Sequence, residues 1–225
     1  MTVDKDNSRL LEIKHSMLKR PSMHFGSIYH HRVLSLLKMI LECSYKASKW
    51  VVKVYENNRF EIVDDGVGIS FSSDNDFGIP YVQAALTTLG ELSVDNPQSI
   101  GLMDSYSIEK GRYVKQPGYP SCGLHYVNTV SDWVEVISRR GYSEFFVRTE
   151  MSEVVESRTY KGETKLTGTS IKFQLDTRFF SDEVNPFLHV GAMTYELRDF
   201  AAFRNMSVRI EDWRKSSVEC FEYNY

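Results

Sequence analysis

The stretch WVVKVYENNRFEIVDDGVGI, residues 50–69, carries the strongest structural signal in this chain. Two segments rich in β-branched and aromatic residues, 50–55 and 59–63, flank an Asn-Asn pair, which is typical of a β-hairpin. Directly after the second segment comes DDGVGI, residues 64–69, where two glycines and an aspartate favour a tight turn. The stretch therefore predicts a hairpin whose second strand ends in a turn that begins with a carboxylate.

The rest of the chain predicts further helices and strands around this hairpin. Apolar residues recur at three- and four-residue intervals in 30–48, which is the pattern of an amphipathic helix. Similar signals predict helices at 80–90, closed by Gly90, and at 189–203, and strands at 133–138, 144–149, 157–162, 169–175, 207–212 and 217–223. Residues 91–122 lack periodicity, so we expect a lid-like loop there. This order predicts an α+β fold, an α/β sandwich whose helices cover one face of a mixed, mostly antiparallel sheet.

Composition places the chain among ordinary globular proteins. It has 225 residues, 42% of them hydrophobic and 25% charged, with a formal net charge of −3. The apolar runs are too short to span a bilayer and the N-terminus lacks the apolar core of a signal peptide, so we expect a cytoplasmic protein without membrane contact. A charge this close to neutral gives no reason to expect direct DNA binding. The cysteines, Cys43, Cys122 and Cys220, have no metal-ligand spacing, and we expect no metal site.

Five motifs, in order, point to one known family. They are Lys19 to Gly26 (KRPSMHFG, beside K-R-P-G-M-Y-I-G), the 64–69 turn (beside D-x-G-x-G-I), Cys122 to Ser131 (CGLHYVNTVS, beside G-G-L-H…V-N-A-L-S), 167–173 (TGTSIKF, beside T-G-T-x-V-x-F) and 195–201 (YELRDFA, beside R-L-R-E-L-A). From about residue 9 to 223, the chain resembles the ATP-binding domain of gyrase B, the ATPase component of DNA gyrase, and of its topoisomerase IV counterpart, which belong to the GHKL superfamily. The resemblance implies the GHKL (Bergerat) sandwich as a single domain over residues 1–225, without the family's transducer or DNA-cleavage regions.

The resemblance also implies an adenine-nucleotide site at the 64–69 turn. In the family, the aspartate of this turn accepts a hydrogen bond from the adenine amino group, and a threonine holds a water beside it. The residues at the corresponding positions are Asp64, Gly66, Gly68, Ile69 and Thr169. Val67 and Ser70 stand where the family has Arg and Pro, which removes part of the pocket wall. The alternative is a structural turn in which the Asp64 side chain caps the backbone.

The residues that hydrolysis requires in this family do not match. The family uses a Glu that activates water and an Asn that ligates Mg²⁺, four residues apart on its first helix. Alignment places Met39 at the Glu position and Cys43 at the Asn position, and residues 30–50 contain no Asn in any register. Another register makes Glu42 the base, but Lys46 then takes the metal-ligand position, where an ammonium group cannot ligate a cation. Glu42 and Lys46 would otherwise form a surface pair on the helix. We therefore expect no catalytic residues.

Phosphate binding is altered as well. In gyrase the segment after G-L-H is G-V-G-x-S, whose backbone amides receive the phosphates. Here Tyr126 follows His125 and these glycines are missing, so a side chain stands where the backbone would approach a phosphate. We expect a triphosphate to bind weakly in consequence, since most of its charge-assisted hydrogen bonds are lost.

These departures lead to one hypothesis and two alternatives. The hypothesis is a degenerate gyrase B-like domain without ATP hydrolysis, which acts as a binding or regulatory protein. Its partner would be another macromolecule: a gyrase or topoisomerase subunit, or a second copy of the chain. The first alternative is an ATP-binding subunit, or a fragment, of a type II DNA topoisomerase. The second is a sensor that binds an adenine nucleotide without hydrolysing it. We expect no cofactor under the hypothesis, and ATP or ADP with Mg²⁺ under the alternatives.

Overall fold

The structure is a computed structural model. It describes residues 12, 14–25, 29–42, 44, 46–73, 78–87, 106–109, 112–115, 123–179, 190–215 and 218–224.

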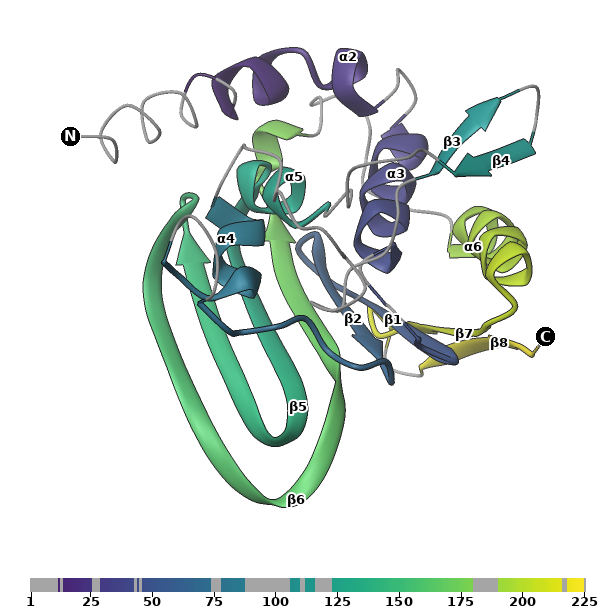
Figure 1. Ribbon diagram of the computed structural model, residues 1–225. Helices are drawn as coiled ribbons and strands as arrows, with labels where there is room; N and C mark the ends of the chain where they lie inside the picture. The colour runs from purple at the N-terminus through teal and green to yellow at the C-terminus, as the bar shows by residue number, and fades with distance from the viewer. Residues whose placement is uncertain are drawn as a thin grey trace.

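A six-stranded sheet forms one layer of the fold, with strand order β5-β6-β2-β1-β7-β8 (Figure 1). Its strands are β1 (Lys49–Tyr55), β2 (Arg59–Asp64), β5 (Ser131–Glu150), β6 (Glu153–Leu175), β7 (Ser207–Asp212) and β8 (Glu219–Tyr223). Neighbouring strands are antiparallel, except that β1 and β7 run parallel. The predicted mixed, mostly antiparallel sheet is confirmed.

The predicted hairpin of residues 50–69 lies at the centre of this sheet. Strands β1 and β2 pair antiparallel, and the register places Trp50 opposite Asp64. Asn57 and Asn58 form the turn with φ of 57° and 56°. Two successive left-handed residues are the mark of a tight hairpin turn, and Asn tolerates this conformation better than other residues with a side chain.

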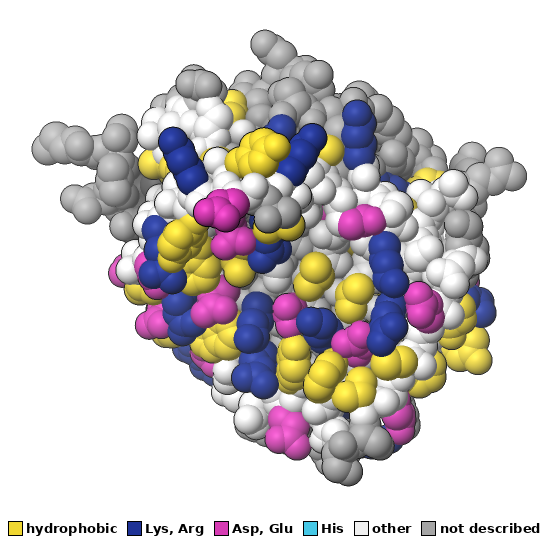
Figure 2. Space-filling view, turned by 90° about the horizontal axis from the view of Figure 1, so that it is seen from below, with side chains coloured by type: hydrophobic (Ala, Val, Ile, Leu, Met, Phe, Trp, Pro, Cys, Tyr) yellow, Lys and Arg dark blue, Asp and Glu magenta, His cyan; other side chains and the backbone are white. Residues whose placement is uncertain are grey.

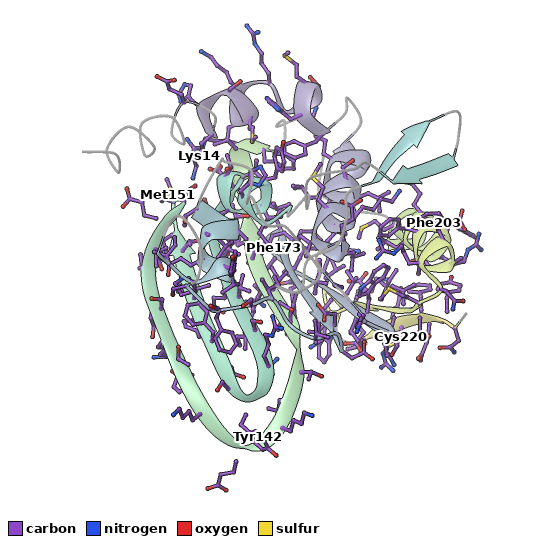
Figure 3. The ribbon with its side chains drawn as sticks, viewed as in Figure 1. Lys14, Tyr142, Met151, Phe173, Phe203 and Cys220 are labelled. Carbon is purple, nitrogen blue, oxygen red and sulfur yellow. The ribbon has the colours of Figure 1, made fainter. Side chains whose placement is uncertain are left out.

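The helices cover one face of the sheet, as predicted (Figure 1). They are α2 (Pro21–Phe25), α3 (Tyr29–Leu41), α4 (Tyr81–Thr87), α5 (Leu124–Thr129) and α6 (Val190–Arg204), with a 3₁₀ turn, η2 (Thr177–Phe179). Their apolar sides bury a continuous core against the sheet, in which Trp50 stacks on Phe200 of α6 at 5.6 Å between ring centroids. Phe60 and Phe173 stack in the same layer at 5.4 Å, and Figure 3 shows Phe173 between the sheet and the helices.

The opposite face of the sheet carries charged side chains of both signs, with apolar ones between them (Figure 2). Ion pairs on this face include Lys53 with Glu61 at 3.4 Å, on the adjacent strands β1 and β2, and Lys49 of β1 with Glu222 of β8 at 3.2 Å, across the intervening β7. The Lys49–Glu222 pair is exposed, and such pairs contribute little to stability. None of the helices among the described residues has the length and apolar character needed to cross a membrane.

The four strands predicted between residues 133 and 175 are two long strands, each of which doubles back. The register of β5 and β6 shifts between Gly141 and Ser143, and Gly141 has a φ of 66°. Figure 3 shows the consequence: Tyr142 lies at the bend of β5, and Met151 lies at the opposite end of these strands, in the turn that joins β5 to β6. The sequence indicated the straight segments correctly but not that bends join them.

Two other expectations need correction, and a third is described only in part. The helix predicted over 30–48 ends at Leu41. The predicted lid-like loop 91–122 contains a hairpin, β3 (Tyr106–Glu109) with β4 (Arg112–Lys115), and its other residues lie outside the described part of the chain. The predicted helix 80–90 is described as far as Thr87, so its expected end at Gly90 lies outside the described residues.

Candidate functional site

The Asp64 carboxylate is the centre of the candidate site. It stands at the end of β2 and is only 8% exposed. Its Oδ1 accepts hydrogen bonds from the backbone N–H groups of Gly66, at 2.8 Å, and Thr169, at 3.2 Å. Its Oδ2 accepts a hydrogen bond from the Ser44 hydroxyl at 3.0 Å. Asp64, Gly66 and Thr169, which the sequence predicted as parts of one site, are therefore in direct contact.

Glycine is required where two segments approach this carboxylate. Gly168 has a φ of +109°, and a Cβ there would lie 2.2 Å from the carbonyl oxygen of Asp64. Gly68 has a φ of +76°, and a Cβ there would lie 2.4 Å from the carbonyl oxygen of Arg139. Next to it, the carbonyl of the fully buried Ile69 accepts a hydrogen bond from the Ser138 hydroxyl at 2.5 Å. The glycines of the motifs therefore have a structural task, to bring the turn against β5 and β6, whatever the site binds.

The pKa values of two adjacent carboxylates in the turn are shifted in opposite directions. Burial raises the pKa of Asp64 to about 6, although the hydrogen bonds from Gly66, Ser44 and Thr169 oppose this. Asp65 is also partly buried, which by itself raises its pKa. There the hydrogen bonds from Ser48 and Lys49 outweigh burial and lower the pKa of Asp65. Asp65 thus anchors the start of β1, and Asp64 is the group whose charge is costly to bury.

Asp64→Asn should change the pH dependence of stability. The pKa of Asp64 rises from 3.8 to about 6 on folding, so its proton stabilises the folded state below pH 3.8, and this contribution is lost as pH rises through 6. Asn can keep both backbone hydrogen bonds and donate to Ser44, and it does not titrate. The free energy of unfolding of the variant, relative to that of the wild type, should therefore rise by up to about 3 kcal/mol between pH 4 and pH 7.5. Denaturant titrations of both proteins across this range measure the difference; parallel pH profiles would contradict it.

The structure describes only some of the positions that the alignment places at the family's catalytic residues. Met39 is half-buried on α3, and Gly123 lies against it so closely that a Cβ at 123 would be 2.3 Å from the Met39 Cβ. Glu42 follows the end of α3 and donates its N–H to the carbonyl of Lys38 at 3.0 Å. Cys43 lies outside the described residues. Because α3 ends at Leu41 and Lys46 has a φ of 56°, the helical four-residue spacing assumed for Glu42/Lys46 does not apply.

Aromatic side chains surround Tyr126, the residue that follows G-L-H in place of the family's glycines. Gly123 immediately precedes α5, a helix of six residues that contains Tyr126. The Tyr126 ring lies edge-on to Phe25 at 6.0 Å and 4.0 Å from the His125 ring, measured between centroids. Phe25 in turn contacts Phe179 at 5.2 Å. This segment is thus packed into the apolar part of the fold, which fits the expectation that it does not form a glycine-rich loop.

Two polar residues of the site region had no role assigned from the sequence. One is Ser44, which had been placed inside the predicted helix and instead reaches Asp64. The other is Asn128 of the V-N-T-V-S motif, which is 2% exposed. Its Nδ2 donates to the carbonyl of Leu86 at 3.0 Å, and its Oδ1 accepts from the Thr149 hydroxyl at 2.5 Å. Asn128 therefore joins α4, α5 and β5. The match of Asn128 to the Asn of the family's V-N-A-L-S motif was the signal for it in the sequence.

Comparison with known proteins gives a consistent set of relatives. The chain is 27% identical to the type 2 topoisomerase B protein of Aquifex aeolicus over 85% of its own length. It is 26% identical to the DNA gyrase B protein of Thermotoga maritima over 91% of its length, and 27% identical to that of Mycolicibacterium smegmatis over 92%. The chain spans only 23% to 31% of the length of these relatives. No family model matches it.

Proposed function

Because the chain is a distant gyrase B-like domain, we propose that it acts by binding another macromolecule and does not hydrolyse ATP. The composition of α3 carries this proposal. Its 13 residues, YHHRVLSLLKMIL, include no Asp, Glu, Asn or Gln, so α3 offers neither a carboxylate to activate water nor an oxygen ligand for Mg²⁺ of the kind the family uses. No register within α3 supplies these groups, and Glu42, the base of the alternative register, follows the end of the helix.

Two contacts support the same proposal. The backbone of α3 at Met39 lies directly against Gly123, at the start of α5. Tyr126 packs against Phe25 where the relatives' nucleotide loop is expected from the resemblance. A triphosphate needs exposed backbone N–H groups and a cation, and an aromatic side chain supplies neither.

Phosphate release from Mg²⁺·ATP tests the proposal. The purified chain should release no phosphate above the rate in buffer, because no residue of α3 has a carboxylate to activate water. Asp64→Asn serves as the control, since it removes the group expected to bind adenine and leaves α3 unchanged. Release that depends on Mg²⁺ and disappears in Asp64→Asn would show that the chain is an ATPase and overturn the proposal.

The proposed partner is a gyrase or topoisomerase subunit, or a second copy of the chain, in the cytoplasm. The relatives are named as subunits, and the chain is similar to them over 85% to 91% of its length. Size-exclusion chromatography of the chain alone and with purified gyrase or topoisomerase subunits tests this. Co-elution or a dimer supports it; a monomer that elutes apart from all of them contradicts it.

A specific observation favours one second candidate, an adenine-nucleotide sensor. Asp64, Gly66 and Thr169, to which the resemblance assigns adenine recognition, are joined by two hydrogen bonds. Such a site would bind the adenine base of a nucleotide without hydrogen bonds to the phosphates of that nucleotide. Calorimetric titration with ADP would favour the sensor if it showed binding in the micromolar range.

A further inference from the structure

The hydrogen bond between Ser44 and Asp64 is the most distinctive contact of the candidate site. The Ser44 Oγ donates to the Asp64 Oδ2 at 3.0 Å, and the two residues are 3% and 8% exposed. They are 20 positions apart, so the contact joins the segment after α3 to the end of β2. Nothing in the motif of residues 64–69 requires it.

The local backbone fixes the Ser44 hydroxyl in this place. The N–H of Ser44 donates to the carbonyl of Leu41 at 3.2 Å, and its own carbonyl accepts from the N–H of Ala47 at 3.4 Å. Lys46 takes the left-handed conformation that turns the chain towards β1. Both backbone groups of Ser44 are thus used in the turn, and its side chain is directed at the carboxylate rather than free to rotate into solvent.

The hydrogen-bonding capacity of the carboxylate is nearly used up. A carboxylate offers roughly four acceptor positions, and Gly66, Thr169 and Ser44 occupy three of them. Both backbone donors bind Oδ1, which leaves Oδ2 as the oxygen available to a ligand. Ser44 is bound to that oxygen, so an amino group that needs the same position must displace the hydroxyl.

We infer that the Ser44 hydroxyl takes the place of a ligand's amino group on Asp64 and keeps this site closed to adenine nucleotides. The inference rests on the second candidate function in one respect, that Asp64 is the group which an adenine base would reach. It adds the residue that decides whether the site is occupied. The chain would then be unable to bind adenine nucleotides well even though its adenine motif is intact.

Removing the hydroxyl should open the site. In Ser44→Ala, Asp64 keeps both backbone donors on Oδ1 and presents Oδ2 unoccupied. A hydrogen bond to a charged group is worth enough to improve affinity about 10- to 100-fold. Calorimetric titration should therefore show ADP binding at least about tenfold tighter to Ser44→Ala than to the wild type. Inosine diphosphate, which has a carbonyl oxygen in place of the amino group, should gain nothing.

Ser48→Ala is the matched control. Ser48 donates its hydroxyl to Asp65, the neighbouring carboxylate of the same turn, at 2.5 Å, and it is exposed. This variant removes the same atom four residues away and should leave ADP binding unchanged. Ser44→Cys, which keeps the shape of the side chain with a slightly larger atom that donates only weakly, should show the gain if Ser44→Ala does not fold.

The outcomes separate this inference from the proposed function. Equal ADP affinity in wild type, Ser44→Ala and Ser44→Cys overturns the inference and leaves the absence of hydrolysis untouched. The same gain in Ser48→Ala, or with inosine diphosphate, also overturns it, because the effect would then come from a loosened turn. Phosphate release by the wild type overturns the proposed function instead.

Discussion

Gly168→Ala should lower the free energy of unfolding by about 3 to 5 kcal/mol. This is a large effect for the addition of a single methyl group. The φ of Gly168 is +109°, a conformation that residues with a Cβ rarely adopt, and the added Cβ would lie 2.2 Å from the carbonyl oxygen of Asp64. The clash is with backbone, so no side chain can move aside. Strands β2 and β6 must separate, and the Thr169 N–H loses its hydrogen bond to Asp64. Thermal unfolding should show a midpoint lower by about 10 °C.

Gly141→Ala separates the clash from the backbone conformation. Gly141 has a φ of +66° at the bend of β5, and a Cβ there would have no atom within 4 Å. This substitution should lower the free energy of unfolding by only about 1 kcal/mol, because the left-handed conformation is its only unfavourable contribution. Equal midpoints for the two variants would mean that β2 and β6 do not approach each other at Gly168 as described.

The second large effect is expected from Asn128→Asp, which should lower the free energy of unfolding by an amount that depends on pH. The Asn128 Nδ2 donates to the Leu86 carbonyl, and an ionised Asp has no donor for it. A charge would also be buried at a position that is 2% exposed, which we expect to cost about 3 to 5 kcal/mol at pH 8. A protonated Asp can donate to Leu86 again, so the loss should shrink as the pH falls towards 5. Denaturant titrations at pH 5 and pH 8 measure both values.

Asn57→Asp provides the comparison for the same chemical change on the surface. Asn57 is exposed in the β1–β2 turn with a φ of 57°, a conformation that Asp also tolerates. Its stability should stay within about 0.5 kcal/mol of the wild type at both pH values. If Asn128→Asp behaves in the same way, Asn128 is not the buried link between α4, α5 and β5.

The elements that the sequence predicted well are those whose signal is local. The β1–β2 hairpin follows from β-branched strands around Asn57 and Asn58, because a tight turn of this kind is selected by residues that tolerate a positive φ. The core-facing pattern of α6 is equally local, and its bounds agree with the prediction to within one residue. The end of α3 was wrong by seven residues, because a contact distant in the sequence, between Ser44 and Asp64, competes with continuing the helix.

The same distinction holds within the candidate site. The motif of residues 64–69 and the T-G-T motif identified Asp64 and Thr169 correctly as neighbours, since motifs record which segments must meet. Ser44 left no such mark, because a single serine in an amphipathic pattern is common on helices. Met39 lies on α3, but Cys43 lies outside the described residues, so the spacing between the two stays a prediction.

The amino-acid sequence alone determined which segments form helices or strands, the turn that holds Asp64 and the lack of Asn in residues 30–50. Periodicity, turn chemistry and composition are local properties, so they do not depend on which segments pack together. The tertiary structure decided which donors reach the Asp64 carboxylate and how deeply it is buried. Hydrogen bonding and desolvation depend on distances between segments as much as 105 residues apart, and those distances exist only in the folded chain.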